Sequence, residues 1–297
     1  MTRGPDVPQI ALTSSRTADY LELTKPNIVG MILVTVAAGF YLGAPDTLDG
    51  LLLVHTLLGS AMVAAGSNAL NQVLERRIDA RMRRTQNRPL PAGRLRVPEA
   101  TLIAWTLGLA GVGYLAVFTN PTVTLLAAAT LGSYVFVYTP LKRKTSLCTL
   151  VGAVPGALPI VGGWAAASGA VPLQAWVLFG ILYLWQLPHF LALAWICRDD
   201  YERAGLRMLS VTSGAEATFR QALAFAVALL PLSLLPSMLG TTGSVYFFGA
   251  LLCSLWLIWA TATAARDRSK AKARRLFLVT VAYLPAVLLL MILDRAL

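Results

Sequence analysis

Apolar residues in this sequence fall into blocks of about 20, separated by short polar segments. An α-helix rises about 1.5 Å per residue, so a block of this length crosses a hydrocarbon core of about 30 Å. Because a helix satisfies its own backbone polar groups in lipid, the pattern predicts an all-α polytopic membrane protein with nine transmembrane helices. The predicted spans are 21–42, 51–74, 100–119, 121–140, 147–167, 172–196, 218–238, 244–265 and 275–293.

Composition excludes a soluble globular domain. Of the residues, 57% are hydrophobic and only 13% are charged, against about 25% charged residues in an average soluble domain. The net charge of +11 would also suit a nucleic-acid-binding protein, but 24 of the 25 Lys and Arg residues lie near the N-terminus or in every second loop. By the positive-inside rule the N-terminus is then cytoplasmic, the C-terminus is on the opposite side, and no nucleic-acid partner is expected.

The predicted domain organisation is simple. Residues 1–18 are expected to form a flexible cytoplasmic tail, and residues 19–297 a single integral-membrane domain. Without signal-peptide or transit-peptide character in the tail, the expected location is the bacterial inner membrane, with the mitochondrial inner membrane as the alternative. Acidic clusters follow the second and sixth spans, four spans apart. This spacing predicts two four-helix halves that face each other, with a ninth helix beside them.

The first acidic cluster lies in NQVLERRIDARMRRTQNRPLPAGRL, residues 71–95. Asn71, Glu75 and Asp79 are spaced by four and would form one oxygen-bearing stripe on a helix. Carboxylates at membrane depth are costly and usually functional, and Mg²⁺ binds through one or two carboxylates plus substrate phosphates. Three arginines follow and could hold a diphosphate: Arg83, Arg84 and Arg88. The alternative is an ordinary interfacial helix end whose acids pair with neighbouring arginines.

The second acidic cluster lies in ICRDDYERAGLRML, residues 196–209. Its carboxylates, Asp199 and Asp200, are flanked by three arginines, Arg198, Arg203 and Arg207. Two facing acidic patches ringed by cations suit two metal ions that bridge a diphosphate. Tyr138 and Lys142, four residues apart at the inner end of the fourth span, could donate to the same diphosphate. Taken on its own, the pair is better explained by an aromatic belt with positive-inside charge.

Three further features have competing interpretations. His189 follows Pro188 in the sixth span, where its imidazole could act as a ligand or form a hydrogen bond within the bundle. His55 lies in the outer half of the second span, so we interpret it as structural or interfacial. GAVPGALPIVGG, residues 152–163, contains two prolines and four glycines. It could open the fifth span beside a flat substrate, but close helix packing through small residues is the favoured explanation.

Residues 71–93 resemble the first signature of the UbiA superfamily of intramembrane prenyltransferases, and Tyr138 with Lys142 matches another element of that superfamily. Glu75, with the following Arg-Thr-Gln-Asn-Arg-Pro, resembles the haem O synthase branch, as does WQLPHFLALAWICRDDYERAG, residues 185–205. The likeness runs from LTKPNIVG, residues 23–30, through the ninth span. Many members carry a further acid four residues before the one that matches Asp200. Here that position is Ile196, which leaves open whether Asp199 substitutes for it.

The resemblance implies roles for particular residues. The ligands of catalytic Mg²⁺ would be Asn71, Glu75, Asp79 and Asp200, with Asp199 as a candidate. The diphosphate would be bound by Arg84, Arg88, Tyr138, Lys142 and Arg198. His189 would contact haem.

The implied reaction is transfer of a farnesyl group from farnesyl diphosphate to a vinyl group of haem b, for terminal oxidase assembly. The implied partners are these two substrates, the lipid bilayer, and a haem A synthase or oxidase assembly factors. One alternative is a related prenyltransferase that acts on an aromatic quinone precursor or a chlorin. A second alternative, from a different class, is a transporter, because broken helices and buried acids also mark ion pathways.

Overall fold

The computed structural model describes residues 15–44 and 47–295, which contain nine segments long and apolar enough to cross a membrane. This number confirms the predicted one. Eight are single helices: α2 (Pro26–Gly43), α3 (Gly50–Asp79), α4 (Val97–Phe118), α7 (Cys148–Ser168), α8 (Leu173–Ile196), α11 (Gly214–Met238), α12 (Ser244–Asp267) and α13 (Lys270–Leu293). The remaining span joins α5 (Pro121–Gly132), the π-helix η1 (Ser133–Tyr138) and α6 (Thr139–Leu141).

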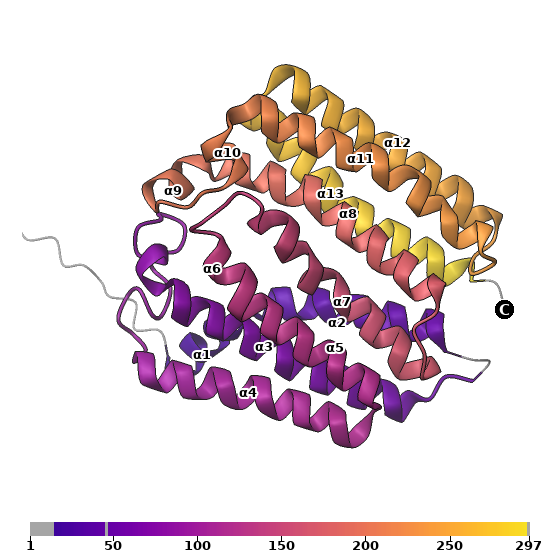
Figure 1. Cartoon of the computed structure of the whole chain (residues 1–297), viewed down its shortest axis with the longest axis horizontal. Helices are drawn as coiled ribbons and strands as arrows, with labels where there is room; N and C mark the ends of the chain where they lie inside the picture. The colour runs from indigo at the N-terminus through magenta and orange to yellow at the C-terminus, as the bar shows by residue number, and fades with distance from the viewer. Residues whose placement is uncertain (1–14, 45–46, 296–297) are drawn as a thin grey trace, which may run out of the picture.

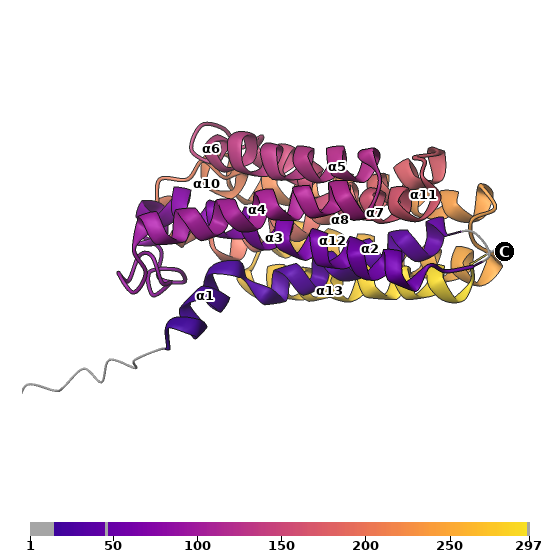
Figure 2. The ribbon, with the colours of Figure 1, turned by 90° about the horizontal axis from the view of Figure 1, so that it is seen from below.

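The spans form two four-helix groups and one additional helix (Figure 1). One group contains α3, α4, the α5–α6 span and α7; the other contains α8, α11, α12 and α13. The additional helix is α2, which packs against α7, α3 and α13. Figure 2 shows the spans side by side along one direction, with α1 and α10 at the same end of the bundle. This end carries the Arg- and Lys-rich loops 80–96, 142–147, 197–213 and 268–269, and we call it the basic end.

The first predicted span differs from the structure at its start. Residues 21–24 belong instead to a separate short helix, α1 (Arg16–Thr24), capped by the Ser15 hydroxyl. Lys25 has a left-handed backbone with φ 54° and ψ 66°, which ends α1, and Pro26 then begins α2. Of the expected 1–18 tail, residues 1–14 lie outside the described residues, and residues 16–18 are helical.

The α7 segment rich in glycine and proline is a continuous helix that packs closely on α2. A Cβ atom at Gly163 would lie 2.0 Å from the backbone oxygen of Val36, and one at Gly39 would lie 2.0 Å from that of Ile160. The close-packing interpretation is therefore confirmed, because only glycine permits this approach of the two backbones. Other small and proline residues of the same segment face a cavity described below.

We expect Gly163→Ala to destabilise the protein by roughly 1–3 kcal/mol, because the added methyl group must push α2 and α7 apart. Gly162→Ala is the matched control, since its Cβ atom would have no neighbour within 4 Å. Thermal unfolding of the two purified variants in detergent checks this prediction. Equal melting temperatures for both variants would contradict the proposed close contact.

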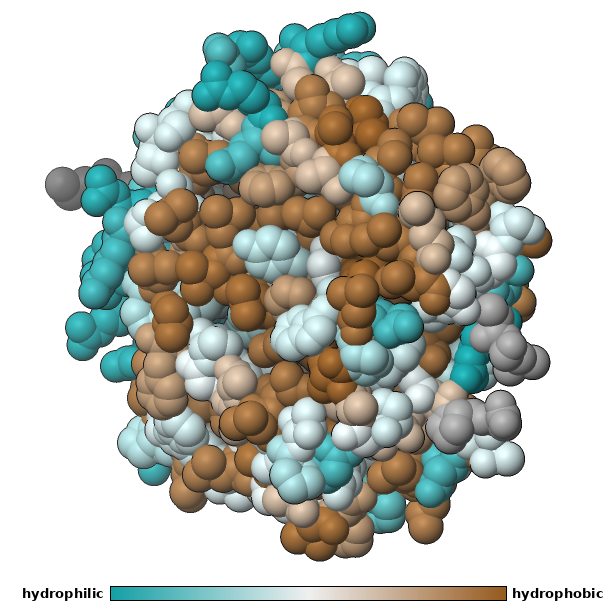
Figure 3. All heavy atoms as spheres, turned by 45° about the vertical axis from the view of Figure 1, so that its right-hand side comes forward, coloured by the Kyte–Doolittle hydropathy of each residue, from teal (hydrophilic) through white to brown (hydrophobic). Residues whose placement is uncertain are grey.

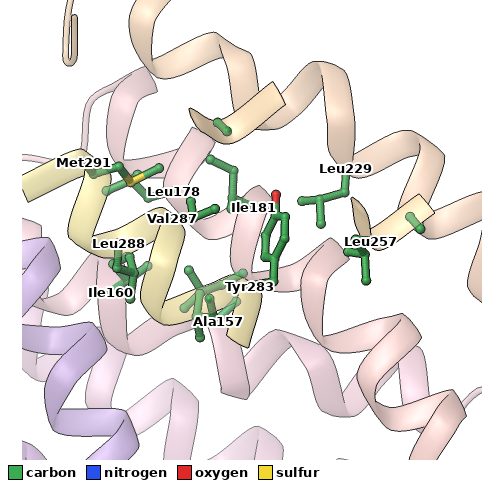
Figure 4. Close-up of a cluster of buried hydrophobic side chains, with 14 of the residues drawn as sticks. Ala157, Ile160, Leu178, Ile181, Leu229, Leu257, Tyr283, Val287, Leu288 and Met291 are labelled. Atoms are coloured by element: carbon green, nitrogen blue, oxygen red, sulfur yellow. The ribbon is translucent and has the colours of Figure 1, made fainter. Parts of the chain in front are cut away.

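Buried side chains of several helices form the core of the second four-helix group. Figure 4 shows Leu178 and Ile181 of α8, Leu229 of α11, Leu257 of α12 and Tyr283 of α13 converging in this core. By contrast, large apolar side chains on the outside are strongly exposed, including Val117 at 74%. Figure 3 shows hydrophobic residues over most of one face, with hydrophilic residues gathered toward its edges. An exposed apolar surface of this extent is expected where a multi-pass protein faces lipid.

Candidate functional site

The acidic stripe of α3 lies at the basic end of the bundle. Helix α3 continues past its apolar part to Asp79, so Asn71, Glu75 and Asp79 fall on one face, and all three are buried. The predicted helical spacing is therefore correct. Buried carboxylates need compensating charge or hydrogen bonds, which directs attention to the groups that surround them.

The loop that follows α3 folds back over Asp79. Arg88 Nη1 lies 2.8 Å from Asp79 Oδ2, and the Thr85 hydroxyl donates to the Asp79 backbone oxygen at 2.9 Å. Asp79 is 1% exposed, and the Arg88 side chain is only 20% exposed. This arrangement places an arginine and a carboxylate of the first motif in direct contact.

The π-helix brings Tyr138 and Lys142 to the same place. The Thr139 amide and hydroxyl both donate to the backbone oxygen of Tyr134, a register that suits a segment in which Pro140 has no amide hydrogen to donate. Asn71 Nδ2 donates to the Thr139 hydroxyl at 3.2 Å. Lys142 Nζ then lies 2.8 Å from Glu75 Oε1 and 4.4 Å from the centroid of the Tyr138 ring.

One residue of this site was missed in the sequence. Lys25 Nζ lies 3.5 Å from Asn71 Oδ1, so the junction of α1 and α2 supplies a third cation. Burial, with the nearby charges of Arg88 and Lys142, lowers the pKa of Lys25 to about 7, although Glu75 and Asp79 oppose this shift. The only sequence signal was its position in LTKP, a short stretch of the resemblance to which no role was attached. We call the group Lys25, Asn71, Glu75, Asp79, Arg88, Tyr138 and Lys142 the polar site.

Of the two acids in the second motif, Asp200 approaches the first motif and Asp199 does not. Asp200 Oδ1 accepts a hydrogen bond from the Arg83 amide at 3.3 Å and one from the Arg203 side chain. The Asp199 side chain is 63% exposed and pairs with Lys270 at 2.7 Å. The hydrogen bond from Lys270 is the largest of the effects that lower the pKa of Asp199. The geometry therefore favours Asp200 over Asp199 as a partner of the first motif.

The remaining predicted cations are placed differently from one another. Arg84 is exposed. Burial raises the pKa of Tyr201 in α9 (Arg198–Arg203), and the positive charge of Arg84 opposes this rise. Arg198 packs over the Trp195 ring at 5.4 Å, and within the described residues it forms no ion pair. The Trp195 indole in turn donates to the Arg268 backbone oxygen. Arg84 thus lies between the two motifs, whereas Arg198 lies toward α12.

A cavity of about 340 Å³ begins beside the polar site and runs into the bundle. Asn68, one helical turn from Asn71, and Tyr138 line its inner end, whereas Leu115 and Val123 line it near the opposite end of the bundle. Its wall is largely apolar and includes Pro155 of α7. The volume lies at the lower end of the range of about 300–1,000 Å³ for ligand pockets. A long apolar substrate with a charged head could therefore lie in the cavity with its head in the polar site.

His189 lines the same cavity from α8. Its Nδ1 lies 2.8 Å from the Thr280 hydroxyl, and its ring stacks with the rings of Trp185 and Phe277. The Thr280 hydroxyl already donates to the Phe277 backbone oxygen at 2.6 Å, so we assign the hydrogen of the imidazole to Nδ1. This assignment leaves the Nε2 lone pair, which has no hydrogen bond to any described residue, available to a ligand.

His55 has the structural role expected from its position. Its Nδ1 lies 2.7 Å from the Tyr114 hydroxyl, and its ring stacks on Phe118 with centroids 4.4 Å apart. These contacts are near the end of the bundle opposite the polar site. His55 is therefore part of an aromatic cluster and not of the candidate site.

The donor atoms of the polar site determine which metal it could accept. Residues 15–44 and 47–295 contain no group of three His, Cys, Asp or Glu side chains arranged to hold a metal ion. The carboxylates of Glu75 and Asp79 supply only oxygen donors, and each already faces a cation. Such a set fits a hard ion such as Mg²⁺ when a diphosphate completes the coordination, and does not fit a structural zinc site.

Comparison with known proteins shows which family and which named proteins this chain resembles. The model of the UbiA prenyltransferase family matches residues 32–284. The protein named protoheme IX farnesyltransferase from Solibacter usitatus is 43% identical over 287 residues, which cover 93% of this chain and 98% of that protein. The protein of the same name from Salinibacter ruber is 44% identical over 277 residues, with the same two coverages.

Solved structures show the same fold at lower identity. A structure described for digeranylgeranylglyceryl phosphate synthase in membranes has a TM-score of 0.80 at 19% identity, covering 94% of this chain and 98% of its own. A UbiA homolog from Archaeoglobus fulgidus bound to GPP and Mg²⁺ has a TM-score of 0.67 at 18% identity, with coverages of 92% and 99%. These two likenesses support the architecture of two helix groups described above.

Proposed function

This chain belongs to the UbiA prenyltransferase family, and on that premise we propose that it transfers a farnesyl group from farnesyl diphosphate to a vinyl group of haem b. The observation that carries the proposal is the polar site at the inner end of an apolar cavity that is also lined by His189. Relatives named protoheme IX farnesyltransferase match nearly the whole chain, which supports the choice of both substrates.

In this mechanism the polar site stabilises the leaving diphosphate. Lys142 and Arg88 lie within 2.8 Å of the acids of α3 and present positive charge at the end of the cavity. Their charge offsets the negative charge that develops as the carbon–oxygen bond of farnesyl diphosphate breaks. Tyr138 adds a phenol beside Lys142. The bond electrons leave with the diphosphate, and the farnesyl group becomes an allylic cation.

The apolar cavity determines which groups can react with the allylic farnesyl cation. The π electrons of a haem vinyl group attack it, forming a carbon–carbon bond and moving the positive charge to the porphyrin side. Water then adds at that carbon and releases a proton, so the product carries farnesyl and hydroxyl groups. Exclusion of bulk water from a largely apolar wall keeps the first cation from being quenched to farnesol.

The bound metal in this proposal is Mg²⁺, as in the Archaeoglobus fulgidus homolog described as bound to GPP and Mg²⁺. Asn71, Glu75 and Asp79 would hold it from α3, and Asp200 would contribute from the second motif. When bound, it would neutralise part of the diphosphate charge. Asp199 is left out of this set because it faces Lys270.

For haem, we propose that His189 Nε2 is the iron ligand. The hydrogen bond from Nδ1 to Thr280 would fix the ring orientation and the tautomer, as metal-bound histidines usually require. We expect His189→Ala to shift the absorption spectrum of bound haem b and to weaken haem binding at least about tenfold. Absorption titration of the purified variant checks this expectation.

Thr280→Val provides a graded comparison, because it removes the partner of Nδ1 but keeps the imidazole. Its spectral change should be smaller than that of His189→Ala. If His189→Ala leaves both the spectrum and the haem affinity unchanged, His189 is a structural residue. Binding of inorganic diphosphate should be unaffected in both variants, since neither residue belongs to the polar site.

The rival functions predict different arrangements of charge. A transporter would place acids along both halves of a path through the membrane, whereas Glu75, Asp79 and Asp200 lie at one end of the bundle, among cations. A prenyltransferase for a quinone precursor or a chlorin would share the polar site. Release of diphosphate from farnesyl diphosphate, measured with haem b, hydroxybenzoate or a chlorin as acceptor, tests the proposal. Release only with hydroxybenzoate or chlorin would overturn it.

We also propose a bacterial inner-membrane location, with the basic end cytoplasmic. The relatives come from bacteria, and the basic end carries nearly all Lys and Arg residues of the spans' connections. The N-terminus then faces the cytoplasm and the C-terminus the opposite side. Haem A synthase or oxidase assembly factors remain the proposed partners.

A further inference from the structure

We propose that Lys25 binds the diphosphate of the prenyl donor, and that the break between α1 and α2 serves to place its ammonium group in the polar site. This proposal deepens the proposed function and rests on it for the identity of the donor. It adds a substrate-binding residue from the N-terminal junction of the bundle. The evidence comes from charge balance, backbone conformation and the way α1 is held.

The charge balance of the polar site leaves Lys25 without an acidic partner. Arg88 pairs with Asp79, and Lys142 pairs with Glu75, each at 2.8 Å. Lys25 reaches only the neutral amide of Asn71, and within the described part of the chain it forms no ion pair. When Lys25 is in its ammonium form, three cations surround two carboxylates, and the group has a net positive charge. An anion at the mouth of the cavity, such as a diphosphate, would balance this excess.

The backbone at Lys25 favours glycine, yet the residue is a lysine. Its φ of 54° lies in the left-handed region, and Lys25 and Arg268 are the only non-glycine residues in the described ranges with positive φ. A residue with a Cβ atom is strained in this conformation, whereas glycine is not. A strained position that keeps a long cationic side chain indicates that the side chain, and not the turn alone, is needed.

Side chains of α3 fix the break beside the acidic stripe. Gln72 Nε2 donates to the backbone oxygens of Glu22 and Leu23 at 3.1 and 2.9 Å, and Asn68 Nδ2 donates to that of Thr24 at 3.4 Å. The bonds to Leu23 and Thr24 satisfy carbonyl groups at the end of α1, where the helix supplies no amide partner. Asn68 and Gln72 flank Asn71 on α3, so the same helix that carries the acids also sets the position of Lys25.

The loop of the first motif holds α1 from its other side. Arg94 pairs with Asp19 at 2.7 Å and with Glu22 at 2.8 Å, and the Tyr20 hydroxyl donates to Glu99. Leu23 is 1% exposed. α1 is therefore held in place by both α3 and the loop. At the junction between α1 and α2, residues 24–26, Lys25 has the one cationic side chain.

The test compares Lys25→Gly, Lys25→Met and Lys25→Arg in the full-length purified protein. The dissociation constant for inorganic diphosphate in the presence of Mg²⁺ is the main measurement, with KM for farnesyl diphosphate and the melting temperature beside it. We expect Lys25→Gly and Lys25→Met to weaken diphosphate binding roughly 10- to 100-fold, since a charge-assisted hydrogen bond is lost. Lys25→Arg should remain within several-fold of wild type.

Lys25→Gly separates binding from folding. Glycine relieves the left-handed backbone, so its melting temperature should not fall, whereas its diphosphate affinity should. Lys144→Met is the matched control, because Lys144 is exposed on a neighbouring loop and lies outside the polar site. Haem affinity should be unchanged in all of these variants.

An unchanged diphosphate affinity in Lys25→Gly would overturn the role of Lys25, as would a loss of affinity accompanied by a matching loss in Lys144→Met. These results are distinguishable from failure of the proposed function. If wild-type protein binds diphosphate but never modifies haem, the acceptor is wrong and the Lys25 comparison still decides its own question. If wild-type protein modifies haem while Lys25→Gly binds diphosphate normally, only Lys25 is excluded.

Discussion

Asp79→Asn is expected to lower kcat/KM for farnesyl transfer by about 100-fold or more, the scale seen when one preorganised electrostatic group is removed from a catalytic site. Asparagine keeps the shape of the side chain but loses its charge. The variant can no longer pair with Arg88, which lies 2.8 Å away, or offer a carboxylate to Mg²⁺. Glu75→Gln should behave in the same way through Lys142. Product formation under saturating haem b, measured over a range of farnesyl diphosphate concentrations, gives the comparison.

Asp199→Asn is the matched control for this prediction. Its side chain is 63% exposed and, among the residues that the structure describes, pairs with Lys270 alone. Such surface pairs contribute about 1 kcal/mol or less. Its activity should therefore stay near that of wild type. Retained helicity and a single monodisperse peak in detergent would show that Asp79→Asn is folded. Full activity in a folded Asp79→Asn variant would remove the metal and diphosphate roles assigned to the polar site.

Lys142→Met is expected to have an effect of similar size, a loss of about 100-fold or more in kcat. Lys142 contacts Glu75 and the Tyr138 ring. Tyr138 lines the end of the cavity at which the diphosphate leaving group would be bound. Methionine keeps much of the length of the side chain but provides no charge to the leaving group. Single-turnover measurements with preloaded farnesyl diphosphate would separate this effect from weaker substrate binding.

Two comparisons make the Lys142 result specific. Arg143→Met removes a cation from the next residue, which is exposed and outside the polar site, and it should leave kcat nearly unchanged. The double variant Lys142→Met with Glu75→Gln should lose less than the two single effects combined, because the two groups are in direct contact. Similar losses in Lys142→Met and Arg143→Met would point to a general effect of loop charge.

Much of the fold was predictable from hydropathy alone. The apolar blocks correspond to the nine spans, because each block must satisfy its backbone within lipid. The stripe Asn71, Glu75 and Asp79 was predictable because α3 simply continues beyond its apolar part and helical geometry fixes the spacing. Close packing of the fifth span also followed from the glycines of residues 152–163, although the sequence did not identify α2 as its partner.

Other parts of the site depend on contacts between distant segments. The end of α1 at Lys25 is set by side chains of Asn68 and Gln72, more than 40 positions away, so the local sequence predicted one helix across 21–42. The π-helix at Ser133–Tyr138 has only Pro140 as a local signal. Neither position could be found from periodicity.

The different contacts of two consecutive acids in the second motif also could not be predicted from the sequence. Asp199 and Asp200 are consecutive on α9, so their side chains point in directions about 100° apart. Only the docking of α9 against the loop of residues 80–96 determines that Asp200 meets the Arg83 amide while Asp199 meets Lys270. Arg198 is likewise carried toward the Trp195 ring by the start of that helix.

The most direct test of the central proposal is the mass of the porphyrin recovered after purified protein in detergent is incubated with Mg²⁺, farnesyl diphosphate and haem b. The proposal predicts a porphyrin heavier than that of haem b by the elements of farnesol, because the vinyl group gains both the farnesyl chain and a hydroxyl group. Over the same incubation time, the amount of this product should be strongly reduced with Asp79→Asn and near that of wild type with Asp199→Asn. Unmodified haem from active, folded wild-type protein, with the farnesyl group transferred to another acceptor, would contradict it.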